Sequence, residues 1–171
     1  MTSNGQATWH KVWHVGDDVD TDALAPGATM QHGIDVIAQH CLENLLPDFA
    51  RDVKPGDIIV AGRNFGIGSS REQAVAALRH LGVAAVIAPS YGGLFFRNAF
   101  NLGLLLLTSP DTETLRNQEL LAHVSIDLEV SFNPEKPIKT APVPDFLLDR
   151  VRAGGLMNQL RQQFGKKALH V

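Results

Sequence analysis

Apolar residues in the middle of the chain follow two alternating spacings. Continuous apolar runs at 58–61, 83–88 and 104–107 are typical of buried strands. Between them, apolar residues at helical spacing predict helices over 70–81 and 94–102, each followed by a glycine that ends it. This strand–helix–strand–helix–strand order predicts an α/β fold in which the three strands pair in parallel.

The flanking segments predict further elements around this unit. Residues 9–15 and 124–130 alternate large apolar and polar groups, so we expect a strand in each, the second one half-exposed. Apolar residues at helical spacing predict a short helix over 34–45. A last helix is expected over 145–164, interrupted at Gly154-Gly155.

The length of 171 residues fits one domain. We expect this domain to span residues 10–164, preceded by a loose N-terminus over 1–9 and followed by a basic C-terminal tail over 165–171. Prolines between 134 and 144 predict a stiff connector before the last helix.

Charge and cysteine content narrow the class of protein. The formal net charge is −3, whereas a nucleic-acid binder normally shows a basic face, so we expect no nucleic-acid partner. The apolar run at 100–107 is interrupted by Asn101 and Gly103 and is too short to span a bilayer. Cys41 is the single cysteine, which excludes a disulfide framework and a metal or cluster site built on cysteines. We therefore expect a cytoplasmic protein with no membrane partner and no metal of its own.

The strongest chemical signal is Gly66-Ile-Gly68-Ser69-Ser70-Arg71-Glu72, where a loop that follows a strand enters a helix. The glycines let the backbone approach a ligand closely, and the helix N-terminus aims N–H groups at the same place. Arg71 can hold a carboxylate through two hydrogen bonds. These features predict an anion site that would stabilise a serine alkoxide, as a proton-abstracting serine requires. The simpler alternative is that Ser69 and Glu72 form a capping box that merely starts the helix.

A second polar segment, Asp17-Asp18-Val-Asp20-Thr21-Asp22, interrupts the chain after the first strand. It resembles the opening of a calcium loop, but Ala23 and Thr29 occupy the positions that require glycine and glutamate. A solvated acidic turn with aspartate caps is therefore the interpretation that the residues alone favour.

Four blocks of the sequence together resemble one family. They are Asp18-Val-Asp20-Thr21-Asp22, then Pro55 through Gly66-Ile-Gly68-Ser69-Ser70-Arg71-Glu72, then Ala88-Pro-Ser90-Tyr, and Arg97-Asn98-Ala-Phe-Asn101-Leu-Gly103-Leu. In this order they resemble the small subunits of 3-isopropylmalate dehydratases, which are the swivel domain of the aconitase superfamily made as a separate chain. The resemblance covers about residues 10 to 160. It implies an aconitase-type swivelling β/β/α domain with a mostly parallel core sheet flanked by helices.

The resemblance also implies an activity and a partner. A large subunit would carry a 4Fe–4S cluster, with none bound by this chain, in a heterodimer or higher assembly. The reaction implied is hydro-lyase chemistry on a small hydroxy acid, with isopropylmalate isomerisation in leucine biosynthesis as the first expectation. Within it, Ser69 and Asp22 are the catalytic residues implied, and Ser70 and Arg71 contact the substrate carboxylate.

The chain departs from the family in the loop that contacts the variable part of the substrate. This loop reads Ala28-Thr29-Met30-Gln31-His32 and lacks the usual arginine. We expect Thr29, Met30 and Gln31 to contact substrate, and the missing cation argues against a long dicarboxylate tail. A smaller substrate of the citramalate, dimethylmalate or maleate type stays open. Outside this reaction class, the alternatives are a non-catalytic anion-binding module and a regulatory copy of the small subunit.

Overall fold

A six-stranded sheet organises the protein, whose computed structural model describes residues 7–116 and 118–165. The spatial order of the strands is β4-β3-β2-β1-β5-β6, with β1 to β4 parallel, β5 antiparallel to β1, and β6 antiparallel to β5. The strands are β1 (His10–His14), β2 (Ile58–Val60), β3 (Ala85–Ala88), β4 (Leu105–Thr108), β5 (Leu121–Val124) and β6 (Val130–Asn133).

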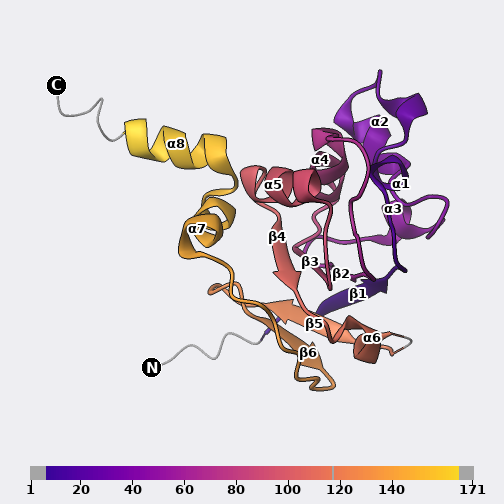
Figure 1. The fold of residues 1–171 in the computed structure, drawn as a ribbon, viewed down its shortest axis with the longest axis vertical. Coiled ribbons are helices and arrows are strands. Elements are labelled where there is room, and N and C mark those ends of the chain that lie inside the picture. The colour runs from indigo at the N-terminus through magenta and orange to yellow at the C-terminus, as the bar shows by residue number, and fades with distance from the viewer. Residues whose placement is uncertain (1–6, 117, 166–171) are drawn as a thin grey trace.

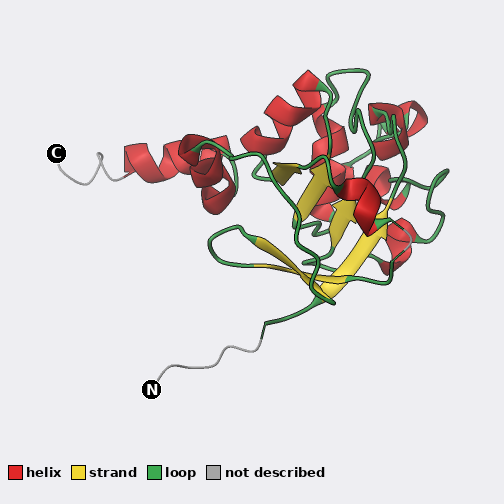
Figure 2. Ribbon diagram, turned by 60° about the horizontal axis from the view of Figure 1, so that its bottom comes forward, coloured by secondary structure: helices red, strands yellow, loops and turns green. Residues whose placement is uncertain are grey.

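The helices that follow β1, β2 and β3 cover one face of the sheet (Figures 1 and 2). α8 projects away from the body of the molecule, and α6 lies near the hairpin. The helices are α1 (Thr21–Leu24), the 3-10 turn η1 (Gly27–Thr29), α2 (Ile34–Gln39), α3 (Phe49–Asp52), α4 (Glu72–His80), α5 (Gly93–Asn101), α6 (Thr112–Leu115), α7 (Asp145–Ala153) and α8 (Leu156–Gly165).

Both faces of the parallel sheet are buried, which explains why its strands are apolar without alternation. Successive residues of a strand point to opposite faces. Ile59 therefore joins the cluster beneath the helices, while Ile58 and Val60 join a second cluster on the other face. That second cluster is completed by Phe132 of the hairpin and by partly buried Ile138 of the proline-rich connector.

The predicted α/β fold with parallel central strands is confirmed. The helices predicted before Gly82 and Gly103 end beside those glycines, and the last helix is interrupted at Gly154-Gly155 as predicted. Most of the predicted loose N-terminus, and nearly all of the predicted basic tail, lie outside the described residues. Within the described ranges no helix is both long and apolar enough to cross a membrane.

Two predicted elements are wrong in extent. The strand expected over 124–130 is instead the turn of the β5–β6 hairpin, where Ser125 Oγ accepts a hydrogen bond from the Glu129 N–H at 3.1 Å. Leu128 takes a φ of +65°, and Ile126 is 91% exposed at the tip. The helix expected over 34–45 ends as α2 at residue 39, because the chain turns through Leu42 with a φ of +60°.

Candidate active site

The loops that carry the candidate residues meet beyond the carboxyl ends of the parallel strands. Asp20, after β1, forms a bridge with Ile67, after β2. Phe65 of the same β2 loop forms a bridge with Tyr91, after β3. In open α/β sheets this edge is where ligands bind, because the loops leaving neighbouring strands converge there.

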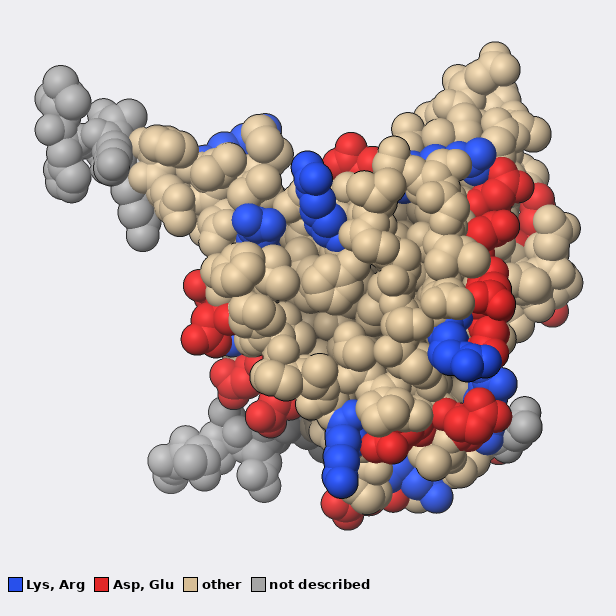
Figure 3. Space-filling model, in the orientation of Figure 1, with Lys and Arg blue, Asp and Glu red and all other residues tan. Residues whose placement is uncertain are grey.

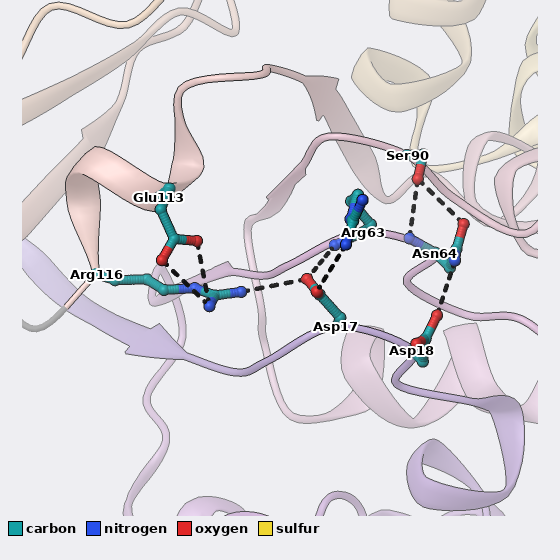
Figure 4. Close-up of polar contacts among 7 residues, drawn as sticks. All are labelled: Asp17, Asp18, Arg63, Asn64, Ser90, Glu113 and Arg116. Carbon is teal, nitrogen blue, oxygen red and sulfur yellow. Dashed lines mark hydrogen bonds and ion pairs between the residues drawn. The ribbon is translucent and has the colours of Figure 1, made fainter.

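Asn64 fixes the course of the β2 loop before it reaches the serines (Figure 4). Its side-chain amide donates to Asp18 Oδ1 at 2.7 Å, and its backbone N–H donates to Ser90 Oγ at 2.9 Å. Asp18 and Asn64 both have positive φ, at 56° and 59°, a conformation that aspartate and asparagine tolerate better than most residues. Asn64 thus ties its own loop after β2 to the loops after β1 and β3.

Asp17 lies between two arginines beside this junction (Figure 4). It accepts a hydrogen bond from the Arg63 N–H at 2.8 Å and contacts the guanidinium groups of Arg63 at 3.5 Å and Arg116 at 3.3 Å. The Arg63 N–H, followed by the charges of both guanidiniums, lowers the pKa of Asp17. Glu113 of α6 holds Arg116 at 3.1 Å, so the chain after β4 is tied to the same edge.

Ser69 and Ser70 are exposed and lie just before α4, which begins at Glu72. The alternative of a capping box is wrong, because Arg71 is the N-cap residue and no side chain caps the helix. The Ser69 N–H instead donates to Thr21 Oγ1 at 3.1 Å, a residue 48 positions earlier. Helix capping therefore does not use the Ser69 hydroxyl. Thr21 is not among the residues predicted from the sequence.

Backbone donors gather where the β2 loop enters α4. Within residues 7–116 and 118–165, none of the backbone N–H groups from Ser70 to Gln73 has a hydrogen-bond partner. The first turn of a helix leaves such donors unsatisfied and adds a partial positive charge. The N-terminus of this nine-residue helix therefore favours the binding of an anion beside Ser69 and Ser70.

Arg71 and Asp22 form the charged part of the site. Arg71 Nη1 donates to Asp22 Oδ1 at 2.6 Å and to the Ala25 carbonyl at 3.0 Å, and its side chain is 25% exposed. Asp22 also accepts a hydrogen bond from the Gly27 N–H at 3.0 Å. Its pKa is lowered, first by the hydrogen bond from Arg71 and then by that from Gly27. In the described part of the chain Nη2 and Nε of Arg71 have no partner, which leaves one edge of the guanidinium for a ligand.

The predicted specificity loop starts at the same carboxylate. Thr29 is 8% exposed, and its hydroxyl donates to the Pro26 carbonyl at 2.7 Å. Met30 is partly buried against the apolar cluster beneath the helices, whereas Gln31 and His32 are exposed. The structure thus brings Asp22, Ser69, Ser70 and Arg71 together. In the loop, Gln31 and His32 are exposed, and the Thr29 hydroxyl hydrogen is already used in the bond to the Pro26 carbonyl.

Residues that could hold a metal do not assemble in the described part of the chain. No three His, Cys, Asp or Glu side chains of residues 7–116 and 118–165 are placed to bind one ion. Cys41 is completely buried, and this burial raises the pKa of its thiol well above the usual range. A thiol must lose its proton to ligate iron, so this cysteine does not fit a cluster.

Surface charge is mixed in sign on one face of the molecule (Figure 3). On the face drawn in Figure 3, Asp and Glu side chains gather along one side with Lys and Arg between them. The wide central area of the same face carries few charged groups. The charge that matters for a small anionic ligand is therefore local, at Arg71 and the start of α4.

Fold and site together define a class: the chain belongs to the Aconitase C-terminal domain family, which matches residues 24–112. Its relatives include the 3-isopropylmalate dehydratase small subunit of Thermodesulfovibrio yellowstonii, 40% identical over 90% of this chain and 93% of the relative. The methanogen homoaconitase small subunit of Methanothermobacter thermautotrophicus is 43% identical over 86% of this chain and 87% of the relative. The crystal structure of 3-isopropylmalate dehydratase from Methanocaldococcus jannaschii superposes with a TM-score of 0.85 at 36% identity, covering 95% and 98% of the two chains.

Proposed function

We propose that this chain is the small subunit of a hydro-lyase that dehydrates and rehydrates a substituted malate. The first substrate proposed is isopropylmalate, isomerised in leucine biosynthesis in the cytoplasm. The observation that carries the proposal is the exposed Ser69 beside the Arg71–Asp22 pair and beside helix N–H groups that have no partner among the described residues. Family membership and the names of the relatives support the reaction class.

Ser69 would act as the base toward the carbon next to a carboxylate. The C–H bond breaks, the proton moves to the Ser69 oxygen, and the electron pair shifts toward that carboxylate as hydroxide leaves the neighbouring carbon. The positive end of α4 and the Arg71 guanidinium favour the alkoxide and the developing negative charge. In rehydration the same hydroxyl returns the proton to carbon. The orientation of the intermediate in the site would determine which of the two carbons receives the hydroxyl group in rehydration.

Arg71 would bind the substrate, and Asp22 would hold Arg71 in position. Arg71 would bind the substrate carboxylate through Nη2 and Nε, because Nη1 is taken by Asp22 and the Ala25 carbonyl. Asp22 holds the guanidinium in place and stays ionised through its lowered pKa. Ser70 would add its hydroxyl and an N–H that has no partner among the described residues.

The site is incomplete in a single chain. Ser69 and Ser70 are exposed, whereas a serine base works in a site closed to water. We propose that a large subunit covers this edge and carries the 4Fe–4S cluster, in a heterodimer or a higher assembly. That cluster would supply the Lewis acid for the departing hydroxyl, and this chain supplies the base and the carboxylate grip.

The loop from Ala28 to His32 supports a substrate with an uncharged variable group. Its described side chains offer a partly buried thioether at Met30 and an exposed amide at Gln31, with no cation. A smaller malate of the citramalate, dimethylmalate or maleate type is the second candidate, because this loop lacks the arginine that the family resemblance implies. A panel of substituted malates, tested on the reconstituted complex, separates the candidates by kcat/KM.

The test of the proposal is Ser69→Ala in the complex reconstituted with the large subunit. Removing the base should lower kcat by about a thousandfold or more while assembly, measured by size-exclusion chromatography, is kept. Ser131→Ala, at an exposed serine on β6, is the matched control and should keep full activity. Full activity of Ser69→Ala contradicts the proposal, and failure of the wild-type chain to bind a large subunit favours the anion-binding module.

A further inference from the structure

Thr21 makes the contact that connects the two candidate loops next to the base. Its backbone N–H donates to the Ile67 carbonyl at 2.8 Å, and its hydroxyl oxygen accepts the Ser69 N–H at 3.1 Å. Thr21 is 2% exposed, so the acceptor oxygen of its hydroxyl is shielded from water although Ser69 itself is exposed. The two hydrogen bonds of Thr21 therefore hold the backbone on both sides of Gly68, at Ile67 and at Ser69.

The neighbours of Thr21 have different tasks. The Asp20 carboxylate accepts the Ala23 N–H at 2.8 Å and caps α1, and Asp22 pairs with Arg71. Both aspartates are exposed, whereas the threonine between them points inward. Three consecutive side chains therefore hold the helix start, the serine backbone and the arginine respectively.

The position of Ser69 depends on this contact, because Gly68 before it does not restrict the rotation of the backbone. Gly68 has a φ of +108° and no side chain to restrict it. A Cβ at Gly68 would lie 3.0 Å from Thr21 Oγ1, so the close passage of the loop itself requires glycine. Across residues 7–116 and 118–165, the Ser69 side chain has no hydrogen bond that would fix it independently.

We propose that Thr21 is a positioning residue whose hydroxyl fixes the Ser69 peptide and thereby aims the Ser69 hydroxyl at the substrate carbon. The proposal rests on the proposed function, because it assigns Thr21 a task in proton transfer by Ser69. Without the acceptor, the peptide between Gly68 and Ser69 rotates to find water, and the oxygen leaves the reacting geometry. Arg71 and Asp22 keep their own contacts, so substrate binding is retained.

A matched pair of variants separates this role from simple packing. Thr21→Val keeps the volume and removes the acceptor, whereas Thr21→Ser keeps the acceptor and removes a buried methyl group. Each is reconstituted with the large subunit, and kcat, KM and the thermal midpoint are measured beside Ser69→Ala. A displacement of about 1 Å in a reacting group costs about a hundredfold in rate, so we expect Thr21→Val to lower kcat about 10- to 100-fold with KM within about threefold.

Thr21→Ser should restore kcat to within about threefold of wild type even where its thermal midpoint is lower. The proposal is overturned if Thr21→Val keeps kcat within about threefold while Ser69→Ala is inactive. It is equally overturned if the loss of kcat in the two variants parallels the loss in thermal midpoint, regardless of whether residue 21 keeps a hydroxyl group. If Ser69→Ala itself retains full activity, the proposed function fails and takes the Thr21 assignment with it.

Discussion

Arg71→Lys changes the carboxylate grip while keeping the positive charge. The arginine uses Nη1 for Asp22 and the Ala25 carbonyl, at 2.6 and 3.0 Å, and presents a second edge for substrate. A lysine has one nitrogen and cannot hold Asp22 and the Ala25 carbonyl while also binding a carboxylate through two parallel hydrogen bonds.

The size of the effect follows from the number of bonds lost. Retaining Asp22 leaves the lysine at most one hydrogen bond for the substrate where arginine makes two. A hydrogen bond to a charged group contributes about 1.5–3 kcal/mol, and every 1.4 kcal/mol is a factor of about ten in affinity. Because the side chain is 25% exposed, the lower half of that range applies, and KM should rise roughly ten- to fortyfold.

The assay is steady-state turnover of the reconstituted complex over a range of substrate concentrations. Arg51→Lys is the control, since Arg51 lies on α3 and its guanidinium is occupied by Asp48 and Asp52. That variant should leave KM unchanged. An unchanged KM for Arg71→Lys, in a protein that melts and assembles as wild type does, would remove Arg71 from the substrate site.

Two further predictions concern the ionisation of Asp22 and the backbone of the β2 loop. The pKa of Asp22 lies below its ordinary 3.8, so the stabilisation from its pair with Arg71 is complete above that pH and is lost as pH falls through the lowered pKa. A carboxyl NMR titration with a midpoint at or above 3.8 would refute this. Gly66→Ala places a Cβ 2.2 Å from the Phe95 ring at a φ of +76° and should cost about 2–5 kcal/mol in urea unfolding. Gly93→Ala meets nothing within 4 Å, and an equal loss there would contradict the steric reasoning.

The central sheet was predictable because local signals agreed with the fold. Apolar runs between helical patterns ended by Gly82 and Gly103 determine both the strands and their parallel pairing. The hairpin was not predictable, because the alternation of apolar and polar residues over 124–130 is typical of one strand. In the structure, the Ser125 side chain closes a turn within this segment. A turn that depends on a side-chain acceptor and a leucine at positive φ has no period to reveal it.

The candidate site was only partly predictable for a related reason. Ser69, Ser70 and Arg71 stand together in the sequence, so their loop and helix already suggest an anion site. Asp22 joins them across 49 positions, and the family resemblance, not spacing, indicated its place. Thr21 gave no signal at all, because a threonine between two aspartates says nothing about a backbone donor 48 residues later.

Hydrogen exchange at the substrate carbon reports whether Ser69 removes the proton. The reconstituted complex is incubated with substrate in deuterated water, and deuterium at the carbon beside the carboxylate is followed by mass spectrometry. We expect steady incorporation by wild type and Ser131→Ala, and none above background by Ser69→Ala in an intact complex. Incorporation by Ser69→Ala at the wild-type rate would show that another group removes the proton.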